Sequence, residues 1–343
     1  MLGCRTLIRT IATPRSSIHQ KFTRNIGLNA KMETGNVKPK VAPFTRAVVA
    51  AMRRVYPEAL ADKSFDNTGL LLEAPFREHG HLKNSALVTV DLTTAVADEA
   101  IRRKDSIIIA YHPIIFRGLK SLTQADTQTT TLLRLAQEGI SVYCPHTAVD
   151  AATGGLNDWL ADIFLSLGPS TRTNITPLKT PVPAGFETAG YGRIVRFSTP
   201  QTLGSIVRKI TEHTELKGVS VAAPQGVVDK PAIEIESIGI CAGSGGSMLN
   251  GLDVDLLFTG ELSHHEALAA IEKGKCVITT FHSNSERGFF RKSIVSRLSR
   301  VVDEEVGVLR RSGEIGEKEE WKIDVSEVDC DPFSLVINGD VGW

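Results

Sequence analysis

Four segments with the composition of β-strands each lead directly into side chains that can bind a metal ion. The segments are 87–90, 107–111, 141–144 and 277–281. Because the carboxyl ends of parallel strands face one crevice in α/β sheets, we expect the polar groups that follow them to meet there. These groups are Asp91, His112, the pair His146 and Asp150, and the pair His282 and Glu286.

Imidazole and carboxylate together form the ligand set of Zn, Fe, Mn, Co or Ni. Asp150 and Glu286 can each bridge two ions, with His112 and His282 as terminal ligands. Two divalent ions held in this way form a clamp for hydrolytic displacement by an activated water. His146 is a candidate proton carrier for such a reaction.

A purely structural interpretation stays open beside this one. A histidine at a strand end is often held only by hydrogen bonds within the fold. Glu286 lies in the first turn of a helix if that helix begins near Ser283 or Asn284, and a carboxylate there commonly serves as a cap.

Weaker candidates lie between residues 242 and 266. The glycine-rich run Ala242–Gly246 resembles a nucleophile elbow, with Ser244, an Asp at 253 or 255, and His264 in the order of α/β-hydrolases. The same run suits a phosphate-cradling turn or a plain tight turn. Glu261 is a second candidate proton carrier. His264 and His265 either line the crevice or begin a solvated helix.

Composition excludes several classes of protein. The 343 residues include 39 Lys and Arg and 39 Asp and Glu, so the net charge is zero, and 42% of residues are hydrophobic. A disordered chain or a general nucleic-acid binder has a different balance. No window approaches the ~20 apolar residues of a membrane span. The 5 Cys contain no C-x-x-C pair, which argues against a disulfide framework and a Cys-ligated zinc site.

Hydrophobic periodicity predicts short strands that alternate with helices, which indicates a layered α/β fold. The Thr- and Pro-rich residues 170–185 predict a loop or linker. Residues 325–337 alternate weakly and predict an edge strand. Strands are predicted at 86–90, 107–111, 140–144, 190–197, 217–223, 235–241, 254–259 and 277–281, and helices at 44–55, 93–103, 130–137, 156–167, 203–213 and 288–298.

The first 32 residues have the composition of a mitochondrial transit segment. They contain six Lys and Arg, several Ser and Thr, and no acidic residue. Initiation at Met32 gives a chain without this segment. We therefore expect a mitochondrial form and a second, cytoplasmic form, and a basic tail without address function is the alternative.

Five motifs occur in an order that resembles the eukaryotic branch of the NIF-three-like family (NGG-interacting factor three). The resemblance covers about residues 44–310 and the short stretch 324–332. The motifs are Asp66–Leu70, Tyr111–Phe116, His146–Asp150, Thr259–Ala267 and His282–Arg287.

The resemblance implies a two-lobed layered α/β fold of the NIF-three-like type with a dinuclear metal site between the lobes. The implied ligands are His112, Asp150, His282 and Glu286, with His146 close by. It also implies a homohexameric ring. Some bacterial relatives are labelled GTP cyclohydrolase type-two-like, although no activity is settled for the family.

On this basis the chain divides into five parts. Residues 1–40 are a transit or disordered segment, and 41–168 form the first lobe. A linker and second-lobe α+β section follows at 169–235. Residues 236–310 return to complete the metal site, and 311–343 are a charged tail with an edge strand.

One position departs from the family pattern. Many bacterial members have two consecutive histidines before the proline, whereas this chain has Tyr111-His112-Pro113. A phenol with a pKa near ~10 is a poor metal ligand at neutral pH. We therefore predict unequal occupancy of the two metal sites.

Two functions follow as hypotheses. The first is a metal-dependent hydrolase that uses two divalent ions on an anionic small molecule, either a nucleotide or a phosphoester. The alternative is a non-catalytic metal-binding scaffold or regulatory protein that acts through ring assembly and protein partners. The metal cannot be identified from these ligands, because they suit several ions.

Overall fold

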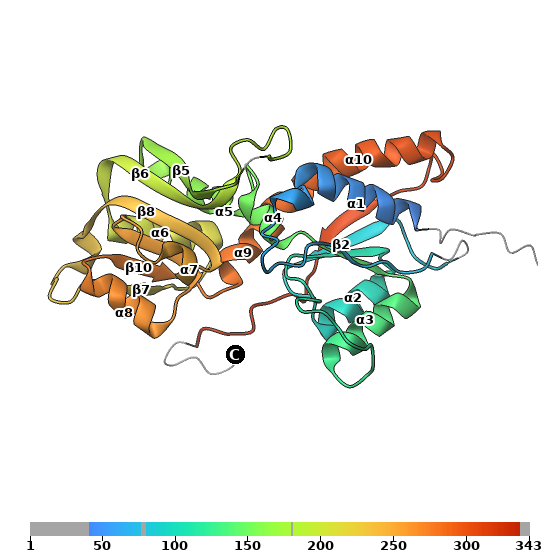
Figure 1. The fold of residues 1–343 in the computed structure, drawn as a ribbon, viewed down its shortest axis with the longest axis horizontal. Coiled ribbons are helices and arrows are strands. Elements are labelled where there is room, and N and C mark those ends of the chain that lie inside the picture. The colour runs from blue at the N-terminus through green and yellow to red at the C-terminus, as the bar shows by residue number, and fades with distance from the viewer. Residues whose placement is uncertain (1–40, 77–79, 180, 337–343) are drawn as a thin grey trace, which may run out of the picture. The chain divides into compact units, whose positions relative to one another are not determined.

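The computed structural model describes residues 41–76, 80–179 and 181–336, all within one compact unit, Pro39–Trp343. The predicted transit segment, residues 1–40, lies outside the described residues. The described chain forms two β-sheets flanked by helices (Figure 1), which confirms the predicted layered α/β class.

The first sheet has five strands in the order β1-β4-β3-β2-β11. Strands β2, β3, β4 and β11 run parallel, and β1 pairs antiparallel with β4 at one edge. The bounds are β1 Gly69–Leu72, β2 Ser85–Thr89, β3 Ile107–Ala110, β4 Ser141–Cys144 and β11 Lys322–Val325.

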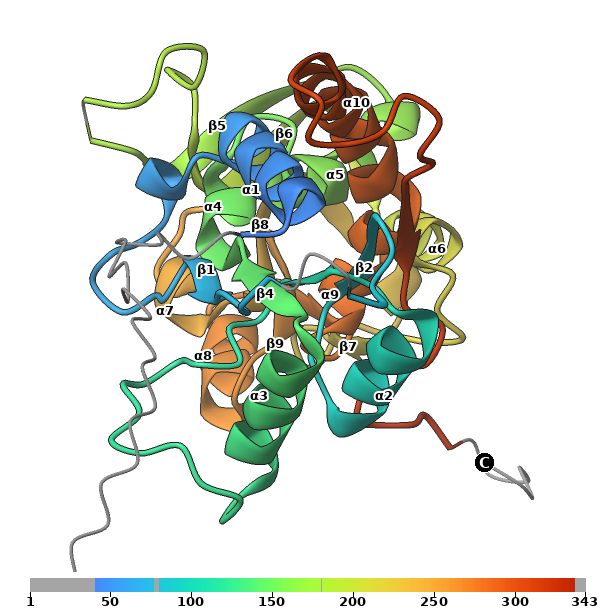
Figure 2. The ribbon, with the colours of Figure 1, turned by 90° about the vertical axis from the view of Figure 1, so that its right-hand side faces the viewer.

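Helices cover both faces of this sheet (Figure 2). α1 (Pro43–Val55) and α10 (Val295–Arg311) pack side by side over one face, and α2 (Thr94–Arg103) and α3 (Thr127–Glu138) over the other. Successive strand residues point to opposite faces, so Val88 packs with the first pair of helices and Leu87 with the second. Strands buried on both faces read as unbroken apolar runs.

The second sheet has six strands in the order β5-β6-β8-β9-β10-β7. Its centre, β8, β9 and β10, is parallel, and the remaining strands pair antiparallel. The bounds are β5 Ser170–Pro177, β6 Gly190–Thr202, β7 Ser220–Ala222, β8 Glu234–Ser244, β9 Leu256–Glu261 and β10 Cys276–Thr279. One face packs against α6 (Leu203–Thr214), and the other against α7 (Gly246–Leu249) and α8 (His264–Glu272).

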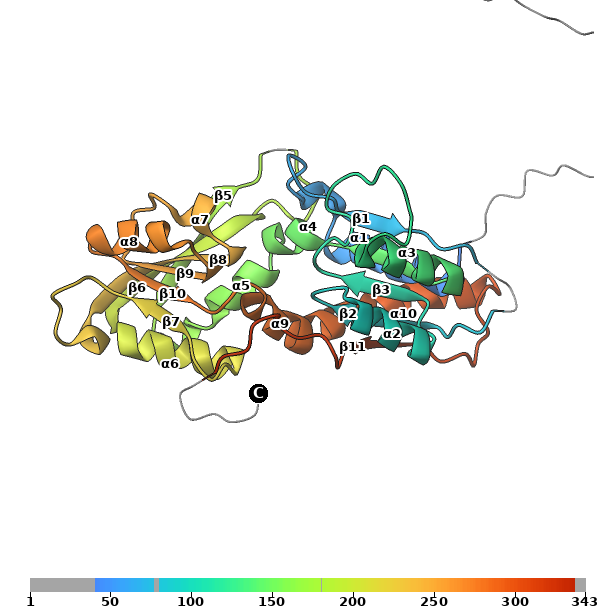
Figure 3. The same cartoon turned by 90° about the horizontal axis from the view of Figure 1, so that it is seen from below.

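Three helices lie between the two sheets (Figures 1 and 3): α4 (His146–Ala151), α5 (Leu156–Asp162) and α9 (Asn284–Phe289). α9 continues through a π-helical turn, Phe290–Ile294, into α10, so one continuous helical segment runs from the second sheet to the first. Short 3-10 turns lie at Glu58–Leu60, Leu165–Leu167 and Lys230–Ala232.

Two sequence-based assignments are wrong. The predicted loop at 170–185 contains β5, whose residues pair with β6 from Ser170 to Pro177. Its threonines are β-branched and fit an edge strand, although Thr and Pro are also common in loops. The predicted edge strand at 325–337 lies earlier, as β11, beside β2. The boundaries at 168, 235 and 310 stay predictions.

No helix within the described residues combines the length and the apolar composition that spanning a bilayer requires. Cys144, Cys241 and Cys276 are buried free thiols, and Cys330 is an exposed one.

A buried ion pair fastens α5 to the second sheet. The Arg193 side chain on β6 is 2% exposed, and its Nε and Nη2 donate to the two carboxylate oxygens of Asp158 at 2.6 and 3.0 Å. Burial alone would raise the pKa of Asp158, but the two arginines beside it, Arg193 and Arg172, hold it below its usual value. Arg193 also donates hydrogen bonds to the backbone carbonyls of Gly190, Gly192 and Ala152, so its guanidinium is held by backbone as well as by Asp158.

We expect Asp158→Ala to lower the free energy of unfolding by about 3–5 kcal/mol, because it leaves the Arg193 charge buried and unpaired. Asp162→Ala is the matched control. Asp162 also pairs with Arg172, but its side chain is 46% exposed, so its loss should cost less than about 1 kcal/mol. Urea denaturation followed by circular dichroism compares the two, and equal losses would contradict the burial argument.

Candidate functional site

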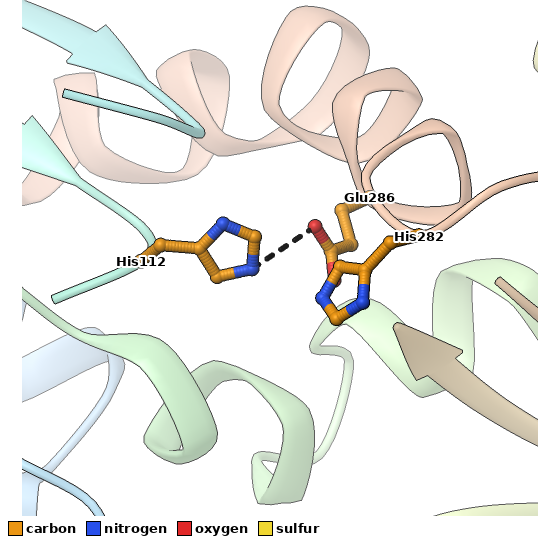
Figure 4. Close-up of side chains that lie close together, drawn as sticks. All are labelled: His112, His282 and Glu286. Atoms are coloured by element: carbon orange, nitrogen blue, oxygen red, sulfur yellow. Dashed lines mark ion pairs between the residues drawn. The ribbon is translucent and has the colours of Figure 1, made fainter. Parts of the chain in front are cut away.

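The side chains of His112, His282 and Glu286 meet at one point (Figure 4). Their ligand atoms, one from each residue, lie within 4.8 Å of one another. Nε2 of His112 is 3.3 Å from Oε2 of Glu286, and Nε2 of His282 is 3.5 Å from Oε1 of Glu286. Two imidazole nitrogens and a carboxylate at such separations can hold a divalent cation.

The two sheets each contribute to this cluster. His112 follows β3 of the five-stranded sheet, whereas His282 and Glu286 follow β10 of the six-stranded sheet. The expectation that all these strand ends lie at the edge of one sheet is therefore wrong. Periodicity indicates strands but not which strands share a sheet, and here the carboxyl ends of parallel strands in two different sheets lead to the same point.

Glu286 is the most buried member of the cluster. It lies in the first turn of α9, as expected, and is 1% exposed. Within the described residues its Oε2 makes no hydrogen bond and has Nε2 of His112 as an ion-pair partner at 3.3 Å. A buried carboxylate is costly unless a cation compensates it, so this oxygen suits either a protonated His112 or a bound metal ion.

Gly243 explains part of the glycine-rich run after β8. A Cβ at this residue would lie 2.8 Å from Oε1 of Glu286 and 3.0 Å from Nε2 of His282, and its φ is +62°. Only glycine lets the backbone approach the cluster this closely. The run is thus a close-approach turn around the cluster.

Three histidines are each held by a carboxylate through Nδ1. The distances are 2.8 Å from His112 to Asp91, 2.9 Å from His282 to Glu261 and 2.7 Å from His146 to Asp66. Metal-binding histidines usually make this second contact, which orients the ring and leaves Nε2 for the ion. The ring of His112 lies 5.2 Å from that of His282 and 5.6 Å from that of His146.

Tyr111 forms a hydrogen bond with Asp150, in which its hydroxyl donates to Oδ1 of Asp150 at 2.7 Å. Burial raises the pKa of Tyr111, and the charges of Asp150 and Glu286 raise it further, so the phenol stays protonated at neutral pH. Burial also raises the pKa of Asp150, to about 6. Asp150 lines the same cavity as the cluster but is not one of the three grouped residues.

The cluster binds a proton strongly when it holds no metal ion. Burial alone would lower the pKa of His112, but the Glu286 and Asp91 carboxylates outweigh it and raise this pKa to about 10. The proton on His112 thus compensates the buried Glu286 charge, and a divalent ion at the same place would compensate it instead.

The cluster opens into a cavity of about 770 Å³, a size common for small-molecule sites. Its lining combines the polar groups of the cluster with aromatic and small side chains from both sheets. Besides the cluster residues it includes Phe65, Phe116, Asn157, Tyr191, Cys241, Ser244 and Met248.

The remaining candidates have other surroundings. Glu261 contacts Nδ1 of His282 and therefore orients that ring. Ser244 lines the cavity, but Asp255, one of the two acids considered as its triad partner, accepts hydrogen bonds from Glu236 and Ser237 instead. His264 begins α8 after the capping residue Ser263, which confirms the solvated helix start.

An ion-pair network behind His112 was not predicted. Nη2 of Arg287 donates to Oδ2 of Asp91 at 2.5 Å, and Nη1 of Arg287 pairs with Asp329. Asp329 also accepts from the backbone amides of Val90 and Asp91, at 2.9 and 3.3 Å. Asp91 could be selected from the sequence because it follows a predicted strand, but no sequence pattern indicates that Asp91 and Asp329 lie close together.

The comparisons with known proteins agree with one another. A family model described as Duf34/NIF3 (NGG1p interacting factor 3) matches residues 44–312. The chain is 46% identical over 283 residues to the Protein NIF3 homolog of Schizosaccharomyces pombe, covering 82% of this chain and 94% of that protein. It is 38% identical over 295 residues to NGG1-interacting factor 3 of Saccharomyces cerevisiae, covering 84% and 96%.

Solved structures share the fold. A Bacillus cereus protein related to NIF3 superimposes with a TM-score of 0.63 at 20% identity, covering 85% of this chain and 98% of that one. Reduced HcgD from Methanocaldococcus jannaschii gives a TM-score of 0.56 at 19% identity, covering 82% and 96%. At these identities the likeness concerns the fold alone. The family model ends at residue 312, so Asp329 lies beyond the matched residues, whereas its partners Val90, Asp91 and Arg287 lie within them.

We expect Asp329→Asn to weaken Zn²⁺ binding at the cluster by about 10-fold, the lower end of the effect of outer-shell residues on metal affinity. The change removes the negative charge that pairs with Arg287. Arg287 in turn pairs with Asp91, and Asp91 orients the ring of His112. Glu327→Gln is the control, since Glu327 lies in the same segment and is exposed. Competition with a chelating dye measures the affinity, and wild-type affinity in Asp329→Asn would contradict the positioning role.

Proposed function

This chain belongs to the Duf34/NIF3 family, and on that premise we propose that it is a divalent-metal-binding protein with a hydrolase-like site. The observation that supports the proposal best is the buried Glu286 carboxylate, whose Oε2 faces Nε2 of His112 at 3.3 Å and whose Oε1 faces Nε2 of His282 at 3.5 Å. Among the described residues Oε2 has no hydrogen-bond partner. His112, His282 and Glu286 would hold the ion.

Asp150 offers a further carboxylate for a second, weaker site. Its Oδ1 already accepts a hydrogen bond from the Tyr111 hydroxyl, and the protonated phenol contributes no ligand atom of its own. The two sites therefore differ in donor number, which supports unequal occupancy. The identity of the ions depends on availability, because these ligands suit Zn, Fe, Mn, Co and Ni.

The proposed reaction is hydrolysis of a nucleotide or a phosphoester. A bound divalent ion would supply Lewis acidity toward a phosphoryl or carbonyl oxygen. The chain's own groups would orient the reactants: Asp91 and Glu261 fix the rings of His112 and His282. His146, held by Asp66, would carry a proton at the wall of the cavity.

A second candidate is a non-catalytic metal-binding scaffold that acts through protein partners and a hexameric ring. The name of the Saccharomyces cerevisiae relative, NGG1-interacting factor 3, favours protein partners for that protein. In this case the metal site would stabilise the fold or an interface without turnover.

We expect Glu286→Gln to weaken metal binding by more than about 100-fold, because it removes a ligand and not just an outer-shell contact. Titration of the metal-free chain with Zn²⁺ or Mn²⁺ should show one tight and one weaker ion in the wild type. Glu272→Gln, an exposed change on α8, is the control for charge. Equal, tight binding of two ions in the wild type would contradict unequal occupancy.

The same variants separate the two functions. Hydrolysis of nucleotides or phosphoesters that requires the metal and is lost in Glu286→Gln supports the enzyme. The scaffold is supported if the wild type binds the metal but hydrolyses none of these compounds, and if the Glu286→Gln variant keeps the cellular function.

We also propose mitochondrial targeting by the first 32 residues, with a cytoplasmic form begun at Met32. The support is the acid-free, basic composition of that segment. A fluorescent fusion of the full chain should colocalise with mitochondria, and a fusion begun at Met32 should be diffuse. Identical diffuse staining of both would contradict the targeting.

A further inference from the structure

Two exposed phenylalanines stand in the lining of the cavity that contains the metal cluster. Phe65 is 54% exposed and Phe116 is 47% exposed, and their ring centroids are 6.4 Å apart with planes inclined by 52°. Large apolar side chains left in water contribute little to folding. A pair of them in the lining of a cavity marks a surface that binds something apolar.

One ring lies on the segment of a cluster residue, and the other lies beside the acid that holds a neighbouring histidine. Phe65 directly precedes Asp66, the carboxylate that holds His146, and Phe116 is four residues after His112. A side chain joins the two segments, since Nδ2 of Asn67 donates to the carbonyl of Ile115 at 2.5 Å. The backbone around Phe65 is fixed as well, because the Asp66 amide donates to the Asp62 carbonyl at 3.0 Å. The rings are therefore positioned relative to the cluster.

The charges in the cavity limit the ligand further. Among the described residues that line it, none is Lys or Arg, whereas Asp62, Asp150 and Glu286 are acidic. Phosphate groups bound by proteins usually meet arginine, lysine or a helix N-terminus. His146 and Thr147, the first residues of the short helix α4, line the cavity, but a polyphosphate that extended beyond the metal ion would also approach Asp62 and Asp150. No arginine or lysine in the described lining would offset its charge, which disfavours a polyphosphate.

We propose that the cavity binds a planar aromatic or heteroaromatic ring on Phe65 and Phe116, with one small metal-binding group directed at the cluster. This rests on the proposed metal site and narrows its substrate class. Within nucleotides and phosphoesters, the compounds that fit carry a ring and at most one anionic group. Because the two phenyl planes are inclined by 52°, the ligand ring would stack on one phenyl ring and make an edge contact with the other; these contacts supply affinity, and the metal ion fixes the reacting end.

Hydroxamates test the ring-binding proposal directly, because the same chelating group is found in compounds with and without an aromatic ring. The probes are acetohydroxamate and three aryl hydroxamates that have zero, one or two methylenes between the phenyl ring and the chelating group. Calorimetry on the Zn²⁺-loaded full chain measures each affinity. We expect the best aryl probe to bind about tenfold more tightly than acetohydroxamate, which corresponds to about 1.4 kcal/mol.

The double variant Phe65→Ala/Phe116→Ala should lose this preference and keep its affinity for acetohydroxamate, which shows that the metal site is intact. Phe333→Ala is the control, since Phe333 is 69% exposed and stacks on Phe281 away from the cavity lining. It should keep the preference.

Equal affinity of all four probes for the wild type, or an unchanged preference in the double variant, would overturn the ring-binding proposal alone. A loss of preference in Phe333→Ala as large as in the double variant would overturn it too. Failure of the wild type to retain Zn²⁺ or to bind any hydroxamate would overturn the proposed metal site, and the ring-binding proposal with it.

Discussion

The structure around the site depends on one constraint, the burial of the Glu286 carboxylate. A charge removed from water needs compensation from its surroundings, and here two imidazoles supply it at 3.3 and 3.5 Å. Gly243 leaves room for this arrangement, because any side chain at that residue would meet the carboxylate and His282. Two sheets, a glycine turn and two histidines thus converge on a single oxygen pair.

The acids around the cluster fix the orientation of the histidines. Each of three histidines contacts a carboxylate through Nδ1, so the rings have little freedom to rotate; the carboxylates are those of Asp91, Asp66 and Glu261. Arg287 is the nearby cation that balances part of this charge, and it pairs with Asp91 behind His112. With a protonated tyrosine also donating to Asp150, the cavity presents acids and imidazoles, which suits cations better than anions.

The sequence predicts the residues of the cluster better than it predicts the sheets and ion pairs that surround them. His112 and His282 follow apolar runs directly, and Glu286 lies four residues after His282, so the sequence marks all three because strand patterns are local. Two features escape this kind of reading. The division of the strands between two sheets depends on pairing over long distances, and Arg287 meets Asp329 through contacts that have no periodic signature. β5 was missed because threonine is common in loops as well as in edge strands.

Asp329 lies 238 residues after Asp91 and accepts a hydrogen bond from the backbone amide of Asp91. His112 is therefore supported by a contact between two distant parts of the chain, the exit of β2 and the segment that follows β11. Contacts of such large sequence separation cost loop-closure entropy before they contribute to stability. A change that loosens the segment after β11 would consequently weaken the support of Asp91 and the orientation of His112, although no residue of the cluster had been altered.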